Sequence, residues 1–103
     1  MLLIQKLEEL IEDEVHDVKK YAKMAAKLKH DHPALSHVLY TISTQEENHQ
    51  AMLHEQVVKI IEQYRREHGA PPPEMQAVYN YLHERAVEKL AEGHRYQEIY
   101  KTT

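Results

Sequence analysis

Apolar positions recur along three long stretches at alternating spacings of three and four, the period of an amphipathic α-helix. In the first stretch, one stripe runs through Leu3, Leu7, Leu10, Glu14, Asp17, Tyr21, Met24 and Leu28. A neighbouring stripe widens this face with Ile4, Ile11, Val15, Val18, Ala22 and Ala25. The stripe of the second stretch is Leu35, Leu39, Ile42, Glu46, His49, Leu53, Val57, Ile60 and Tyr64. Both patterns predict bundle helices with a broad buried face.

Proline and glycine divide these stretches. Pro33 suits the first turn of a helix, and Gly69 followed by three prolines suits the end of one. These helix-starting and helix-ending residues predict helices over residues 2–29, 33–67 and 74–101. The third stretch (Val78, Leu82, Val87, Leu90, Ile99, Tyr100) is less regular and more charged, and Gly93 weakens it locally.

These elements predict an all-α protein. Residues 1–68 form a long antiparallel hairpin because a tight turn joins the first two helices. Residues 69–73 are a Pro-rich linker, and residues 74–103 carry a C-terminal helix that covers part of the hairpin. A hairpin alone has no closed core, so a second copy is expected to complete a ferritin-like four-helix bundle.

Composition narrows the possible chemistry. The 103 residues suit one domain, and the absence of cysteine excludes disulfides, thiolate metal sites and thiol nucleophiles. The net charge of −4 is spread over interleaved acidic and basic residues, which argues against nucleic acid as the main partner. No apolar run is long enough for a signal peptide or a membrane span, so a cytoplasmic location is expected.

Polar residues interrupt the apolar stripes at Glu14, Glu46 and His49. An unpaired carboxylate in a bundle core costs several kcal/mol, so such a group is usually neutralised, paired or bound to metal. Glu14 lies about 17 residues before the turn and the Glu46–His49 pair about 15 to 18 after it, so the three side chains are expected to meet at one level. The alternative is a buried hydrogen-bonded network that fixes helix register.

A two-fold dimer would bring together four glutamates and two histidines. This matches the ligand set of di-iron carboxylate bundles, in which two helices each give a Glu and two give Glu-x-x-His. Two metal ions per dimer are expected, and the same donors accept iron, manganese or zinc.

The segment from Glu14 to Tyr21 and Ala26, followed by Glu46-Glu47-Asn48-His49, resembles the metal-binding half of a rubrerythrin in the ferritin-like superfamily. In that family a Glu precedes an aromatic residue by seven positions, and Glu-x-x-His follows a little over thirty residues later. The resemblance covers roughly residues 2 to 66. The pattern is also similar to that of encapsulated ferritins, whose single hairpins assemble a di-iron site between subunits.

The resemblance implies a di-iron protein that oxidises Fe(II) with dioxygen or peroxide, as a ferroxidase or peroxidase. Glu46 would bridge the ions, with Glu14 and His49 as terminal ligands. Rubrerythrins have two hairpins per chain and a four-cysteine module. This chain has one hairpin and no cysteine, so a homodimer or higher even-numbered oligomer and an external electron donor are expected.

Four further residues are secondary candidates. Asp17 and Glu47 are possible auxiliary ligands, although a rim position suits Asp17 better and a solvated position suits Glu47 equally well. Tyr21 and Tyr40 could donate hydrogen bonds to ligands or relay electrons, although core packing is the commoner role of such residues. Two other functions stay open, namely a helical interaction module with a structural or vestigial metal site, and metal storage in a larger assembly.

Overall fold

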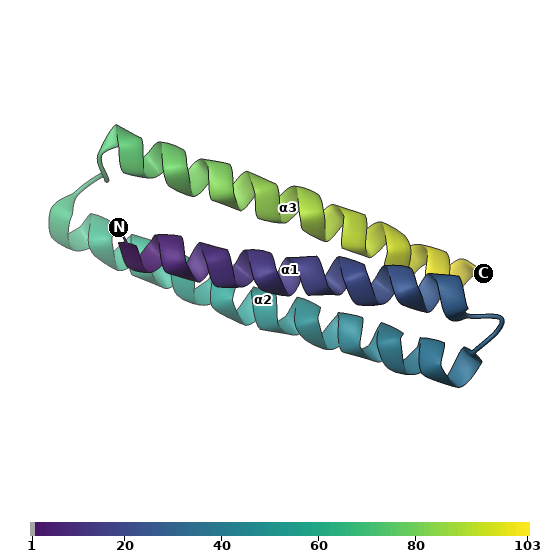
Figure 1. The fold of residues 1–103 in the computed structure, drawn as a ribbon. Helices are drawn as coiled ribbons and strands as arrows, with labels where there is room; N and C mark the ends of the chain where they lie inside the picture. The colour runs from purple at the N-terminus through teal and green to yellow at the C-terminus, as the bar shows by residue number, and fades with distance from the viewer. Residues whose placement is uncertain (1) are drawn as a thin grey trace.

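A computed structural model describes residues 2–103, and residue 1, where the expected hairpin region begins, lies outside them. The described chain forms three helices, α1 (Leu2–Leu28), α2 (Pro33–His68) and α3 (Pro73–Thr102), and contains no strand. The predicted all-α class is therefore confirmed. The helices lie side by side in a rod of 55 × 19 × 18 Å (Figure 1).

The helix ends lie within one residue of the predicted bounds. The His32 backbone N–H donates to the Leu28 carbonyl over 2.8 Å, and Pro33 then occupies the first turn of α2. At the other end of α2, Gly69 takes a φ of 78° and its N–H donates to the Arg65 carbonyl over 3.0 Å. A positive φ is a backbone conformation that glycine adopts without steric cost, and the prolines that follow prevent the helix from continuing.

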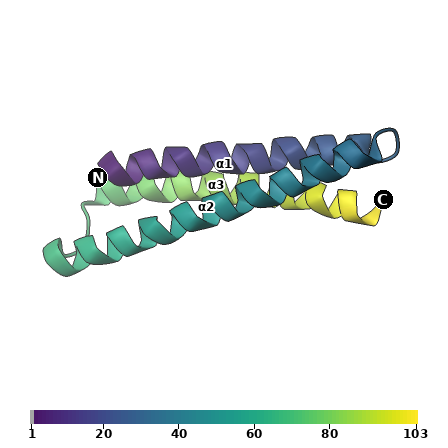
Figure 2. The same cartoon turned by 90° about the horizontal axis from the view of Figure 1, so that it is seen from below.

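The long helix α1 packs along both of its neighbours, whereas the backbones of α2 and α3 come close to each other at few places. In Figure 2 α2 runs obliquely across the direction of α1 and α3. The chain termini lie at opposite ends of the rod (Figure 1). α3 therefore joins the hairpin as a third helix and leaves another side of α1 and α2 uncovered.

Only one of the two predicted stripes of α1 forms the core of this chain. The second stripe is buried together with Glu8, against residues of α2 and α3 that include Val57 and Ala86. In the first stripe, Leu3 and Leu10 are each about half exposed, at 51% and 50%. The prediction that both stripes form one buried face is wrong for the single chain, because α2 and α3 together cover only one side of α1.

Small residues bring the helices close together near the middle and far end of α1. A Cβ atom added to Gly93 would lie 2.8 Å from Val18 Cγ1, so this glycine lets α3 approach α1. The buried Ser43 hydroxyl donates to the Val18 carbonyl over 3.1 Å, and the buried Ser36 hydroxyl to the Ala25 carbonyl over 2.5 Å. Gly93 was expected to weaken its helix, but α3 is continuous there because tertiary packing compensates.

Polar contacts attach α3 to both other helices. The buried Gln97 amide donates to Ser43 Oγ over 2.9 Å and to Glu47 Oε2 over 3.4 Å, and His94 contacts the same Glu47. We refer to Ser43, Glu47, His94 and Gln97 as the polar layer. On the other side of α3, Arg85 and Lys89 each lie 2.6 Å from Glu12 of α1, and Glu92 lies 2.6 Å from Lys19.

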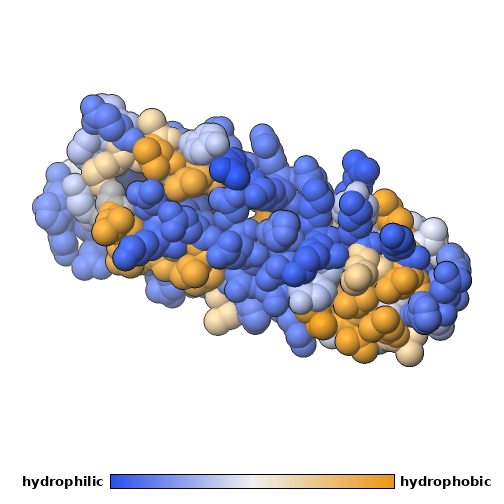
Figure 3. All heavy atoms as spheres, in the orientation of Figure 1, coloured by the Kyte–Doolittle hydropathy of each residue, from blue (hydrophilic) through white to orange (hydrophobic). Residues whose placement is uncertain are grey.

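The surface combines charged and apolar regions. On the face shown in Figure 3, apolar atoms gather towards the two ends and the middle is predominantly polar. Among the described residues, no helix has the length and apolar character needed to cross a membrane.

Candidate metal centre

Glu14, Glu46 and His49 lie together near the middle of the hairpin, as their distances from the turn predict. Glu14 projects from α1, and Glu46 and His49 project from successive turns of α2. One donor atom from each residue lies within 4.8 Å of the other two. Within residues 2–103 this is the one group of three such side chains that comes this close.

The donor separations suit a shared ion. His49 Nδ1 lies 3.4 Å from Glu14 Oε2 and 3.7 Å from Glu46 Oε2. Two donors bound to one ion at about 2.1 Å each are about 3.4 Å apart at a tetrahedral angle and at most about 4.2 Å apart. The three side chains therefore need little movement to hold one divalent cation.

The two carboxylates share an electrostatically unfavourable position. Proximity to the Glu14 carboxyl, with which it can share a proton, is the largest influence raising the pKa of Glu46. Burial and the negative charge of Glu14 raise this pKa further, a charged Asp17 adds to the effect, and a charged His49 opposes it. A proton or a metal cation is therefore favoured between the carboxylates.

One atom of the group lacks a partner. Glu14 Oε2 is buried and accepts no hydrogen bond, although His49 Nδ1 is close enough for an ion pair. A buried carboxylate oxygen in that condition is destabilising unless a cation neutralises it. The unpartnered oxygen and the two-carboxylate, one-imidazole donor set both fit iron, manganese or zinc.

The site opens to solvent on the side away from α3. The His49 side chain is 54% exposed, whereas those of Glu14 and Glu46 are 28% and 19% exposed. A groove of about 460 Å³ lies beside it, lined by Glu14, His49, Met52, Leu53, Glu55 and Gln56. An ion or a small molecule could reach the carboxylates from this groove.

The secondary candidates do not join the group. Glu47 lies against α3 in the polar layer, and Asp17 lies 3.5 Å from Lys20 Nζ on its own helix. The Tyr40 ring stacks on Tyr100 of α3 with centroids 4.4 Å apart. Tyr21 is half-buried on α1 with Lys20 Nζ over its ring, 5.0 Å from the centroid.

Glu8 was not predicted from the sequence, yet it is 1% exposed and has no hydrogen-bond partner on either carboxylate oxygen. Its surroundings in the sequence, Lys6-Leu7-Glu8-Glu9, suggest a solvated position. The signal that could have identified it is the spacing Ile4, Glu8, Ile11, Val15, which places Glu8 within the buried stripe. His83 of α3 is half-buried and stacks on His54 of α2.

Comparisons of this chain with known protein families, curated proteins and solved structures find no match.

Proposed function

We propose that this protein binds a pair of metal ions through Glu14, Glu46 and His49 of two copies of the chain. The observation that supports the proposal best is the convergence of three metal-binding side chains, one with an unpartnered buried oxygen, within two otherwise apolar stripes. Charge supports the pairing, since four carboxylates in a dimer would balance two divalent cations.

A single chain offers too few ligands for a closed site. It supplies two carboxylates and one imidazole, whereas di-iron carboxylate bundles use four carboxylates and two imidazoles. The second copy proposed here doubles the set. It would also cover the open groove and remove the site from bulk water, which strengthens every electrostatic interaction within it.

Exposed apolar side chains follow the same face on both sides of the site. Leu3 and Met24 of α1 lie eleven residues before and ten after Glu14, and each is about half exposed. On α2, the exposed apolar residues on either side of Glu46 and His49 are Leu35, Val38 and Met52. Because the stripe is nearly symmetric about Glu14, a two-fold axis through the site would pair Leu3 of one copy with the Met24 region of the other. We call this surface the open face.

The reaction that fits the site best is oxidation of Fe(II) by dioxygen or peroxide, with electrons supplied from outside when turnover continues. Iron, when bound, supplies the redox chemistry. The chain contributes two carboxylates that hold a cation, an imidazole at the solvent side, and a protonatable Glu46 whose raised pKa lets it exchange a proton for metal.

Metal content and solution mass test the proposal together. We expect about one iron per chain after anaerobic Fe(II) loading, in an even-numbered assembly, with optical bands appearing on exposure to air. The variant Glu14→Gln/Glu46→Gln/His49→Ala should retain none. A control variant with the same charge change at exposed positions, Glu9→Gln/Glu62→Gln/His30→Ala, should bind as the natural chain does. Equal iron in both variants would overturn the proposal.

A non-catalytic helical module with a structural metal site is the second candidate, supported by the exposed apolar residues of the open face. In that case metal raises the unfolding temperature and strengthens the dimer without turnover. Steady-state consumption of dioxygen or peroxide with Fe(II) distinguishes the two, because a structural ion gives stability and no consumption.

A further inference from the structure

Glu8 is a charged residue placed in the core without a counter-charge. Its side chain is 1% exposed, and both carboxylate oxygens lack hydrogen-bond partners. Within residues 2–103 no lysine or arginine forms an ion pair with it. An ionised carboxylate under these conditions costs several kcal/mol, so the site requires a positive charge or a proton.

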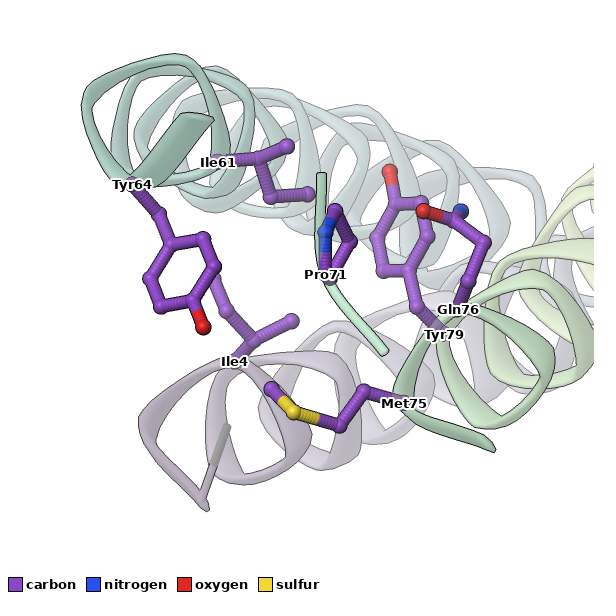
Figure 4. Close-up of a pocket in the computed structure, with 7 residues that line it drawn as sticks. All are labelled: Ile4, Ile61, Tyr64, Pro71, Met75, Gln76 and Tyr79. Carbon is purple, nitrogen blue, oxygen red and sulfur yellow. The ribbon is translucent and has the colours of Figure 1, made fainter. Parts of the chain in front are cut away.

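Three ring side chains from the other two helices lie near this position. A positive charge on His54 of α2 would act on Glu8, and Tyr79 of α3 is near enough to sense a charge on Glu8. His83 of α3 stacks between them, with centroids 5.2 Å from His54 and 5.8 Å from Tyr79. Figure 4 shows Tyr79 reaching from α3 towards α2 at the neighbouring end pocket.

The other charges nearby are already neutralised or act on Tyr79. Glu12, one turn along α1, is paired with Arg85 and Lys89. Arg65 of α2 acts on the Tyr79 hydroxyl. Glu8, His54 and His83 do not form a group of three metal-binding side chains within residues 2–103. His54 makes neither a hydrogen bond nor an ion pair with Glu8, so a proton on the Glu8 carboxyl itself is the simplest way to remove the buried charge.

We propose that Glu8 carries a proton in the folded chain, and that losing it as the pH rises opens the seam between α2 and the first half of α3. The proposal is independent of the proposed metal site, because Glu8 faces the core beneath α3 and not the open face.

The seam is where the cover over Glu8 is weakest. The backbones of α2 and α3 come close at few places, and at this level the stack of His54 on His83 bridges them. An exposed hydrogen bond of 3.4 Å from Arg65 to Gln76 is the side-chain hydrogen bond that joins α2 to the first turns of α3. A groove of about 160 Å³, lined in part by the two histidines and Gln50, brings solvent to the stack. The second half of α3 is held by the polar layer, so opening is expected near residues 74–84 and not near residues 94–101.

The direction of the pH effect follows from the cause of the shift. Burial raises the pKa of Glu8 above its ordinary 4.5, and a positive charge on His54 lowers it. A carboxyl with a raised pKa in the folded state stabilises the fold fully below pH 4.5 and loses that contribution as the pH rises through the folded pKa. Each unit of difference in pKa corresponds to about a tenfold change in the opening equilibrium.

Hydrogen exchange of the natural chain and of Glu8→Gln tests this. The glutamine has the shape of the protonated acid and cannot ionise. At pH 5 the two proteins should exchange alike over residues 74–84. At pH 8 we expect the natural chain to exchange about tenfold faster or more there, with residues 94–101 unchanged. Comparison at equal pH cancels the intrinsic pH dependence of exchange. Glu9→Gln, an exposed neighbour with the same charge change, should behave as the natural chain.

A second measurement uses no variant. The carboxyl carbon resonance of Glu8 in the natural chain should titrate with a midpoint above the ordinary value of 4.5. Equal exchange of the natural chain and Glu8→Gln at both pH values, faster exchange spread evenly over α3, or a Glu8 midpoint at or below the ordinary value would each overturn the proposal.

Discussion

At the scale of single residues, three positions depart from the ordinary behaviour of their type. Gly93 lies inside a helix, Glu8 carries a carboxyl into the core, and Glu46 shares its surroundings with a second carboxylate. The behaviour of each depends on the helices packed against it. Substitution at each should therefore change tertiary contacts more than helix content.

Gly93→Ala should destabilise the fold although alanine is the better helix former. The new Cβ would lie 2.8 Å from Val18 Cγ1 and 3.4 Å from the Lys19 backbone nitrogen. Overpacking of this kind costs about 1–3 kcal/mol, which exceeds the gain of about 1 kcal/mol in helix propensity. Urea unfolding measures the difference.

A double variant checks the cause. Val18→Ala removes the methyl group that the new Cβ would meet, so Gly93→Ala should cost less in the Val18→Ala background than in the natural chain. Equal costs in the two backgrounds would show that the close approach of Gly93 to Val18 is not the reason.

Glu46→Gln should change the pH dependence of stability in opposite directions with and without metal. In the metal-free chain the raised pKa of Glu46 stabilises the fold below pH 4.5 and is lost as the pH rises. The stability of metal-free Glu46→Gln should therefore rise relative to that of the natural chain between pH 5 and pH 8. With metal bound, the natural chain should instead gain stability relative to the variant as the pH rises. Protons compete with the ion at low pH, and the variant lacks one ligand.

Thermal unfolding at several pH values, with and without Zn²⁺ as a redox-inert probe, measures both effects. Glu62→Gln, exposed on the same helix, is the control and should follow the natural chain under both conditions. A constant difference between Glu46→Gln and the natural chain across the pH range would mean that Glu46 does not titrate in this window.

At the scale of helices, the sequence predicts well that the three helices exist and where they end, and predicts poorly how they pack. Pro33, Gly69 and the following prolines end helices through the backbone alone, so their effect can be predicted locally. The level at which Glu14 meets Glu46 and His49 follows from counting residues along an antiparallel pair. What was not predicted is which of the two adjacent stripes on α1 faces α3, because α3 has no clear apolar stripe to match with either.

The polar layer shows most clearly that contacts between helices are hard to predict from local sequence. Ser43 and Glu47 of α2 lie 47 to 54 residues before their partners His94 and Gln97 of α3, and each residue alone suits a solvated position. Gln97→Ala should cost about 1–3 kcal/mol, since it removes the donor to Ser43 and Glu47 at a buried position. Denaturant unfolding of this variant measures the loss.

Glu98→Ala is the matched control for that change. It alters the next, exposed residue of α3 and should stay within about 0.5 kcal/mol of the natural chain. If Gln97→Ala is equally mild, the contacts of Gln97 contribute little and α3 is held by its apolar residues and ion pairs alone.

At the scale of the whole molecule, the fold leaves the proposed metal ligands Glu14, Glu46 and His49 beside an open groove, with exposed apolar residues on either side of them. The open face combines half-exposed leucine and methionine side chains with a carboxylate oxygen that lacks a partner. A single function, association with a second copy around bound metal, accounts for both features. Association and metal retention should then be lost together.

Leu3→Lys/Met24→Lys tests this coupling away from the ligands. Both positions lie about 15 Å or more along α1 from Glu14, so the new charges cannot act directly on a bound ion in solution at physiological ionic strength. Both are half exposed in one chain, so the helices should still form. We expect the mass in solution to fall to that of one chain and iron retention to fall at least tenfold.

Val87→Lys, which changes an exposed apolar residue of α3 outside the open face, should alter neither the mass in solution nor iron retention. An intact dimer would mean that the open face is not the interface, whereas a monomer that still holds one iron would mean that Glu14, Glu46 and His49 of one chain suffice.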